Sequence, residues 1–205
     1  MGQRKRPWRA ELLQDWHRYS EGAPASWKTI LAHLVFDAGF LAVFLFRMAA
    51  ALESRGRARL ARLVHRLNMV VSAAELSPDA EVKAGLYLPH PYGVTIGTGC
   101  RVGPDVTLFQ GAVLGAKRVD RDGDAPRREY PTIERGATIY PHAVIFGGIR
   151  VGEDAVILTN SVVGRDVPAG RTFGGIPATE IRGPRPDHDT RGEPAAEPSG
   201  AGESR

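Results

Sequence analysis

The sequence contains a single cysteine, Cys100, among 205 residues. One cysteine excludes a disulfide within the chain and a zinc site built on cysteines, and it fits the reducing environment of the cytoplasm. A secretory signal is also missing, because residues 1–26 contain no apolar core followed by a small-residue cleavage site. The sequence therefore predicts a cytoplasmic protein.

An excess of charge of one sign is missing as well. Lys and Arg number 27 against 23 Asp and Glu, and the net charge of +4 is spread between Arg4-Lys5-Arg6 and scattered arginines. This balance does not indicate a nucleic-acid partner. Hydrophobic residues make up 42% and charged residues 24% of the chain, as in an ordinary globular domain with a short appended segment.

Long uninterrupted apolar runs are absent too. The stretch from Ile30 to Leu52 comes closest, but His33, Asp37 and Arg47 interrupt it. A membrane span usually needs about 18 uninterrupted apolar residues, and a charge near its centre is costly. We expect a buried or interfacial helix here, and weak membrane association through residues 30–52 stays open.

Residues 1–72 read as an N-terminal helical segment. Leu60, Leu63 and Leu67 recur at helical spacing with arginines between them. Ser26 is the expected N-cap of the apolar helix, and residues 53–56 are the expected turn into the next helix.

Glycine and proline, by contrast, are abundant, at 24 and 15 residues, so frequent turns are expected. From Leu76 onward aliphatic residues recur every six positions. The longest series is Ile133, Ile139, Ile145, Val151, Ile157 and Val163. Mainly small residues follow four positions later, namely Ala137, Ala143, Ile149, Ala155 and Ser161. Two series precede it along the chain. The first is Leu76, Val82 and Leu88, and the second, offset from it by two residues, is Ile96, Val102, Leu108 and Leu114.

This period predicts short strands with one inward aliphatic side chain each. Three such strands close one coil of a β-helix, and coils stack at the strand spacing of about 4.8 Å. A sandwich of short strands would show a period of two instead. Gly97, Gly103 and Gly152 follow inward aliphatic residues, where we expect turns that need wide backbone freedom.

The predicted β-helix domain covers residues 73–182. Its repeat is interrupted by the charged segment 116–131, which should loop out of the solenoid. The ends of a solenoid must be covered, and the N-terminal helices and residues 173–181 are the expected caps. Residues 183–205 are rich in Pro, Gly, Glu and Asp and are expected to be a disordered tail.

Three motifs carry a resemblance to a known family. They are His90-Pro91-Tyr92-Gly93-Val94-Thr95-Ile96-Gly97, Leu108-Phe109-Gln110-Gly111-Ala112-Val113-Leu114-Gly115, and Gly174-Gly175-Ile176-Pro177-Ala178. Over about residues 72–182 the chain resembles the serine O-acetyltransferases. The resemblance implies a mainly β fold with a helical N-terminal segment, a left-handed parallel β-helix of hexapeptide repeats. It also implies homotrimers or dimers of trimers, with acetyl-CoA bound between neighbouring β-helices and no metal.

The resemblance assigns the general base to His90, which would take the proton of the acceptor hydroxyl. An imidazole suits this role because its ordinary pKa, about 6.5, lies near the working pH. The family pairs this histidine with an aspartate fifteen residues earlier, where this chain has Glu75. A carboxylate there would fix the tautomer and stabilise the imidazolium. A solvated surface charge is the alternative for Glu75, and a turn histidine is the alternative for His90.

The acceptor site departs from the family pattern. Pro89 replaces an aspartate that would hold the serine ammonium, and Tyr130 stands where the family has a histidine preceded by arginine. Arg127 or Arg128 is the candidate substitute for that arginine. Tyr130 either donates a hydrogen bond to the substrate or packs at the base of the loop. L-serine is therefore the leading acceptor, and a sugar or another small hydroxylated metabolite is the alternative.

The resemblance places four residues near CoA, and these are Ala143, Gly147, Ser161 and Arg165. Arg165 would meet a CoA phosphate, and a solvated arginine at a corner of the coil is the alternative. A zinc site of three histidines is not expected, because residues 75–182 hold only His90 and His142. A non-catalytic trimeric scaffold is the remaining alternative. The family's isoleucine-terminated tail, which docks onto the next enzyme of cysteine biosynthesis, is not matched by Glu203-Ser204-Arg205.

Overall fold

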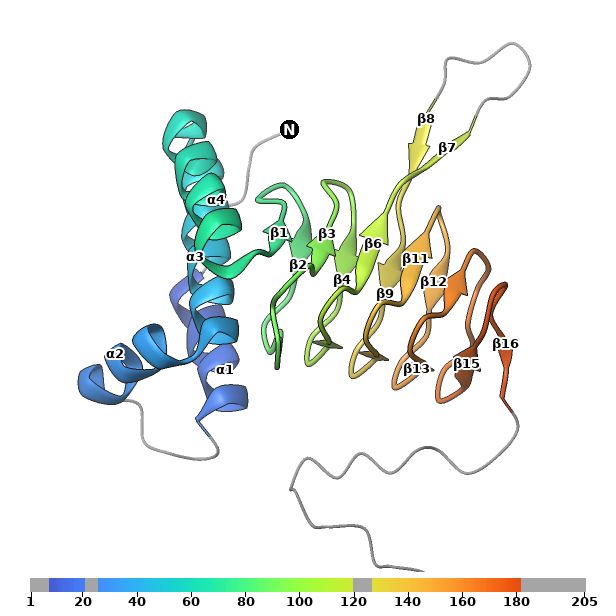
Figure 1. Cartoon of the computed structure of the whole chain (residues 1–205). Coiled ribbons are helices and arrows are strands. Elements are labelled where there is room, and N and C mark those ends of the chain that lie inside the picture. The colour runs from blue at the N-terminus through green and yellow to red at the C-terminus, as the bar shows by residue number, and fades with distance from the viewer. Residues whose placement is uncertain (1–7, 21–25, 120–126, 182–205) are drawn as a thin grey trace, which may run out of the picture.

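The computed structural model describes residues 8–20, 26–119 and 127–181. Four helices precede a stack of short strands (Figure 1). The helices are α1 (Trp8–Tyr19), α2 (Trp27–Phe36), α3 (Ala38–Glu53) and α4 (Ala58–Ser72). The expected tail, residues 183–205, lies outside the described residues.

The single helix expected from Ile30 to Leu52 is wrong. Asp37 ends α2 and begins α3, since its backbone is extended and its side chain accepts a 2.9 Å hydrogen bond from the N–H of Phe40. The two helices bend by 107° at this residue. Within the described residues no single helix is long and apolar enough to cross a membrane. The bent pair of α2 and α3 together has the length and composition of a span. Ser26 is confirmed as the N-cap of α2.

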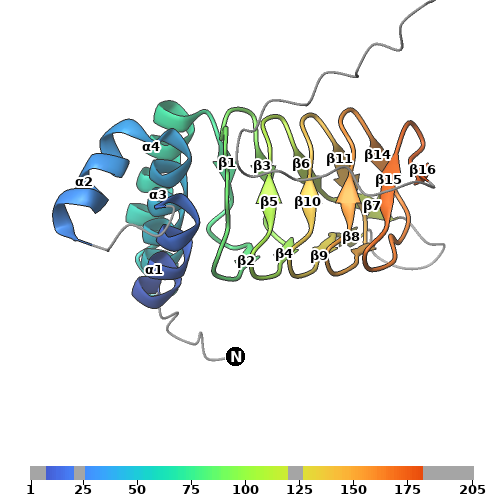
Figure 2. The same cartoon turned by 90° about the horizontal axis from the view of Figure 1, so that it is seen from below.

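The strands form three parallel sheets that the chain visits in rotation (Figure 2). Sheet A holds β1 (Glu75–Leu76), β3 (Thr95–Ile96), β6 (Val113–Gly115), β11 (Val144–Phe146) and β14 (Val162–Val163). Sheet B holds β2 (Glu81–Val82), β4 (Arg101–Val102), β9 (Thr132–Ile133) and β12 (Arg150–Val151). Sheet C holds β5 (Thr107–Leu108), β10 (Thr138–Ile139), β13 (Val156–Ile157), β15 (Thr172–Gly174) and the antiparallel β16 (Thr179–Glu180). The fold is therefore a parallel β-helix.

The six-residue period lines the interior of this β-helix. Leu76, Ile96, Leu114 and Ile145 stack on successive strands of sheet A and are all completely buried. Burying one such side chain contributes about 1.5–3 kcal/mol. Because each strand is only two or three residues long, this column of aliphatic contacts, repeated on each sheet, holds the coils together.

The glycines after inward aliphatic residues act differently from expectation. Gly97, Gly103 and Gly152 do not adopt positive φ angles. Instead the next coil passes close to them, and a Cβ on Gly103 would lie 2.8 Å from the backbone nitrogen of Arg135. The left-handed corner positions are held by other residues, among them Gly111 at φ 68° and His142 at φ 59°.

The charged insertion leaves the solenoid as an antiparallel hairpin of β7 (Lys117–Val119) and β8 (Arg127–Glu129) (Figure 1). At the N-terminal end of the solenoid, the helices cover the first coil (Figure 1). Arg47 on α3 and Asp15 on α1 form a buried ion pair of 2.8 Å, and Arg47 also donates to the carbonyls of Val82 and Lys83. The first coil has no preceding coil to bond its backbone. The side chain of Arg47 supplies hydrogen bonds to two of its carbonyls instead.

Candidate functional site

His90 lies on a corner of the first coil that is two residues longer than the later corners between sheet C and sheet A. We call residues 88–94, which join sheet C to sheet A, the His90 corner. Eight positions separate Tyr87, which bridges to Thr107, from Thr95 at the start of β3, whereas six separate Thr107 from Val113. The two extra residues push His90 outward, and its side chain is exposed. An exposed imidazole on an extended corner is accessible to a substrate.

Glu75 lies beside this corner on β1. Its N–H donates to the carbonyl of Val94, and the N–H of Gly93 donates to the carbonyl of Ala73. The Glu75 side chain is exposed, on the outer face of sheet A. Within the described residues no hydrogen bond joins Glu75 to His90, so their pairing stays a prediction.

The helices hold the His90 corner from behind, which the sequence did not predict. The phenol oxygen of Tyr19 accepts a 2.8 Å hydrogen bond from the N–H of Leu88. Asp15 accepts from the N–H groups of Gly85 and Leu86 at 2.8 and 3.0 Å. Burial raises the pKa of Tyr19 well above its ordinary value, so the phenol stays protonated.

Helix α3 also approaches this corner closely. A Cβ on Gly39 would collide with the carbonyl oxygen of Leu88, so only glycine permits this approach. No sequence pattern marks such a contact, because the partner lies about fifty positions along the chain. The backbone just before His90 is therefore fixed by two helices.

Tyr130 packs at the base of the hairpin. Its ring lies directly over Gly99, where a Cβ would clash with it, and it contacts the interior only in part. Within one chain Tyr130 therefore packs at the base of the hairpin, as one of its two predicted roles requires. Arg128 is exposed on β8 opposite Arg118, and its neighbour Arg127 forms a 2.9 Å ion pair with Glu129.

His90 and Tyr130 lie at opposite edges of sheet A. The strands of this sheet are parallel, so their starts share one edge and their ends share the other. The His90 corner precedes β3, whereas the hairpin follows β6. Gly93 and Gly97, which bound β3, are roughly 13 Å apart in extended chain. Pro89 lies with His90, so the predicted acceptor residues are not brought together within one chain.

The four residues expected near CoA divide into two kinds. Ala143 and Ser161 are completely buried, and the Ser161 hydroxyl accepts a 3.2 Å hydrogen bond from the N–H of Gly175. Gly147 lies beside Lys117 of the hairpin. Arg165 is exposed, donates to the carbonyl of Ala178 and lies over the ring of Phe173. Ala143 and Ser161 expose no surface to a ligand within one chain.

No group of three or more His, Cys, Asp or Glu side chains in the described ranges is placed to hold a metal ion. His142 lies over Gly111, on the same edge of the solenoid as the His90 corner. Burial raises the pKa of the Cys100 thiol to about 11, which leaves it protonated and unreactive at neutral pH.

Comparison with known proteins gives one consistent family. A serine acetyltransferase of Bacillus licheniformis is 36% identical over 143 residues, which is 70% of this chain and 64% of that protein. A serine acetyltransferase of Helicobacter pylori is 31% identical over 174 residues, covering 83% of this chain and 96% of that protein. The chain thus spans less than two thirds of the Bacillus relative. No family model matches.

Solved structures agree with these relatives. Soybean serine acetyltransferase, solved in complex with serine, superposes with a TM-score of 0.72 at 29% identity, over 85% of this chain and 69% of that one. A serine acetyltransferase solved in complex with CoA has a TM-score of 0.67 at 28% identity, over 83% of this chain and 66% of that one. The chain belongs to the serine acetyltransferase family.

Proposed function

We propose that the chain is an acetyl-CoA-dependent serine O-acetyltransferase, which converts acetyl-CoA and L-serine into O-acetylserine and CoA in cysteine biosynthesis. One observation carries this proposal: an exposed histidine lies on a lengthened corner of the β-helix, in a chain whose match covers 96% of the Helicobacter pylori relative. The relatives solved with serine and with CoA support these two molecules as acceptor and donor. The single cysteine supports a cytoplasmic location.

His90 acts as the general base in the proposed reaction. Its free ring nitrogen removes the proton of the serine hydroxyl as the oxygen attacks the thioester carbonyl. The tetrahedral intermediate then expels the CoA thiolate, which takes the proton back from the imidazolium. The acetyl group ends on the serine oxygen, and the products are O-acetylserine and CoA with a free thiol.

Glu75 acts on the far nitrogen of the same ring. The backbone bonds between residues 73–75 and 93–94 place β1 directly beside the His90 corner. In the proposed arrangement the exposed Glu75 side chain turns toward the imidazole. A carboxylate there holds one tautomer and stabilises the imidazolium, as in other histidine bases.

The proposed active unit is a trimer of left-handed β-helices. Sheet A separates His90 from Tyr130 and the hairpin in one chain. A site that uses both edges needs the hairpin of a neighbouring copy. In this assembly Arg128 of the neighbouring copy reaches the substrate. The proposal does not require that two trimers associate into a hexamer.

CoA lies in the groove between neighbouring copies. Gly147 and the exposed Arg165 lie on the corner that follows sheet A, where Arg165 is available to a phosphate of CoA. Ala143 and Ser161 are completely buried in one chain, so they support the strands beside this groove and their part in CoA binding is indirect.

The test is release of free CoA thiol from acetyl-CoA by the purified protein, with L-serine, homoserine and a panel of sugars as acceptors. Turnover with L-serine that disappears in His90→Ala supports the proposal. Turnover only with another hydroxyl compound would assign the chain to a different acceptor. Such a result would agree with Pro89, which replaces the aspartate expected to hold the serine ammonium. Absence of turnover with every acceptor would indicate a non-catalytic trimeric scaffold.

A further inference from the structure

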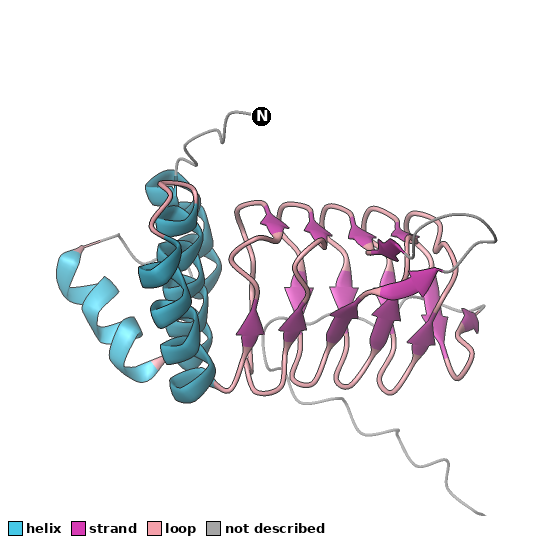
Figure 3. Cartoon of the chain, turned by 90° about the horizontal axis from the view of Figure 1, so that it is seen from above, coloured by secondary structure: helices cyan, strands magenta, loops and turns pink. Residues whose placement is uncertain are grey.

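Exposed apolar side chains are concentrated on the helices that cover the first coil. On α2, Trp27, Leu31 and Val35 follow one another at four-residue spacing with exposed fractions of 71%, 52% and 66%, and Phe36 is 86% exposed. Trp27, Leu31 and Val35 form a stripe along one face of α2, and Phe36 lies at its last turn. Helix α2 is also the element farthest from the solenoid (Figure 3). Contiguous apolar surface of this kind marks an interaction site.

Helix α4 carries a second exposed stripe. Its buried residues Ala61, Asn68 and Ser72 face the rest of the protein. On the outward side lie Leu60, Leu63, Leu67, Val70 and Val71, which are 47–81% exposed. Arg59, Arg62 and Arg66, all exposed, run beside this stripe. An outward face that combines leucines with arginines is typical of a helix that lies in a membrane interface.

Among the described residues of the helical segment, which include the turn between α3 and α4, all exposed charges are positive. They are Arg9, Lys28, Arg55, Arg57, Arg59, Arg62 and Arg66. The acidic residues of these helices are not exposed: Glu11 and Asp15 pair with Arg47, Asp37 caps α3, and Glu53 is half-buried. The exposed charge of these helices therefore suits a negatively charged partner.

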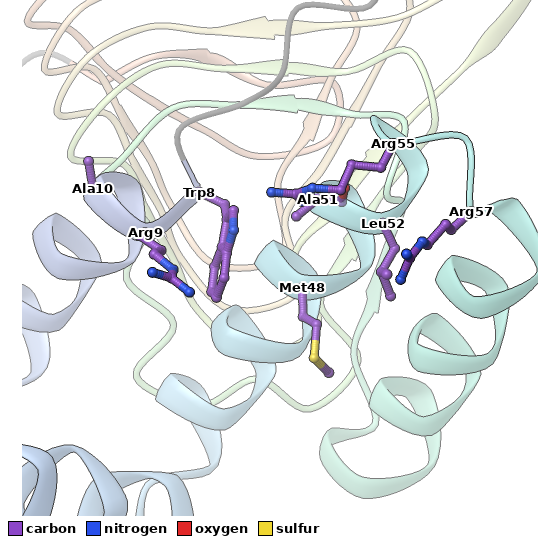
Figure 4. A pocket seen from close by; sticks show the side chains of 8 residues that line it. All are labelled: Trp8, Arg9, Ala10, Met48, Ala51, Leu52, Arg55 and Arg57. Carbon is purple, nitrogen blue, oxygen red and sulfur yellow. Dashed lines mark hydrogen bonds between the residues drawn. The ribbon is translucent and has the colours of Figure 1, made fainter.

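A hollow of about 610 Å³ lies between the start of α1, the end of α3 and the turn that follows it (Figure 4). Trp8, Met48 and Leu52 give it an apolar lining, and Arg9, Arg55 and Arg57 add three guanidinium groups. Apolar and cationic groups side by side match the acyl chain and the phosphate of an anionic lipid.

We propose that the outward faces of α2 and α4 bind the surface of an anionic phospholipid membrane. A second copy of the chain is the competing occupant. A symmetric contact of two copies through α4 would place the arginines of one copy near those of the other. No exposed carboxylate of these helices would lie between them, so the contact is unfavourable. An anionic membrane meets both the apolar stripes and the arginines. Helix α3, which fills most of the segment 30–52, is largely buried and takes no part.

The experiment is co-sedimentation of the full chain with vesicles of phosphatidylcholine alone and with vesicles in which part of the lipid is phosphatidylglycerol. The expected result is binding to the anionic vesicles that weakens as salt is raised. Replacing Arg59, Arg62 and Arg66 by Gln should lower the affinity on the order of a hundredfold, since each arginine contributes about fivefold. Leu63→Ser should lower it by about tenfold.

The matched control replaces three exposed arginines of the solenoid, Arg101, Arg150 and Arg171, by Gln and should bind as the wild type does. Circular dichroism checks that every variant keeps its helices. Equal binding to both kinds of vesicle, no binding, or equal losses in the two triple variants would overturn the proposal. So would an assembly in solution that breaks up in Leu63→Ser, because a second copy would then occupy the α4 face.

Discussion

The phenol oxygen of Tyr19 on α1 accepts a hydrogen bond from the N–H of Leu88, two residues before His90. This bond joins the helical segment to the corner that carries the proposed base. Both Tyr19 and Leu88 are buried, so water does not replace the bond when it is lost. The helices are thus part of the support of the site as well as a cover for the first coil.

Tyr19→Phe removes this acceptor and leaves the Leu88 N–H unpaired. We expect the free energy of unfolding to fall by about 1–3 kcal/mol, and kcat to fall because the His90 corner is held less firmly. Urea unfolding and turnover with L-serine measure the two effects. Tyr92→Phe, on a tyrosine that is 57% exposed, is the control for stability. An unchanged unfolding midpoint in Tyr19→Phe would show that the bond does not hold the corner.

The buried pair of Arg47 and Asp15 should contribute far more to stability than exposed pairs do. Arg47→Met leaves the Asp15 carboxylate buried without a cation, and we expect a loss of about 3–5 kcal/mol. Arg150→Met is the comparison, since its 2.9 Å ion pair with Glu134 lies at the surface and should contribute less than about 1 kcal/mol. Chemical denaturation of both variants measures the difference. Similar losses in the two would contradict the role given to Asp15.

Cys100 should make the fold less stable at alkaline pH. Its pKa is raised from 9.0 to about 11 by burial, so between these values the unfolded chain releases the thiol proton and the folded chain keeps it. Stability is therefore complete below pH 9.0 and falls as the pH rises toward 11, by about 3 kcal/mol at most. Denaturation of the wild type and Cys100→Ala across this range tests it. Parallel pH profiles for the two proteins would refute it.

Pro89 is the residue through which the acceptor preference can be tested. Pro89→Asp places a carboxylate beside His90, where it can pair with the ammonium group of L-serine. We expect KM for L-serine to fall by about tenfold with a smaller change in kcat. Pro89→Asn, which has the same shape without the charge, should leave KM near that of the wild type. Equal KM values in the two variants would mean that the serine ammonium binds elsewhere.

The β-helix was readable from the sequence because its signal is local and repeated. Ile133, Ile139 and Ile145 are six positions apart and all are buried. The lengthened corner with His90 was visible as an offset in the same period. The break at Asp37 is not readable in the same way, since a capping aspartate and a charge inside one helix look alike in a sequence.

The support of the site was not readable from the sequence. Asp15 and Arg47 are 32 positions apart, and Asp15 and Gly85 are 70 apart. Contacts over such distances leave no periodic pattern. The ring of Tyr130 packs over Gly99, and a hydrogen bond from its hydroxyl to the substrate stays a prediction.

The most direct test of His90 as the general base is turnover of L-serine and acetyl-CoA by His90→Ala beside the wild type, with His17→Ala as the control. His90 is exposed and makes no bond to other described residues, so the variant should fold normally while kcat falls by about 10²–10⁴-fold. His17, exposed on α1, should be replaceable without loss. Undiminished turnover in His90→Ala would contradict the proposed role of His90 as the general base.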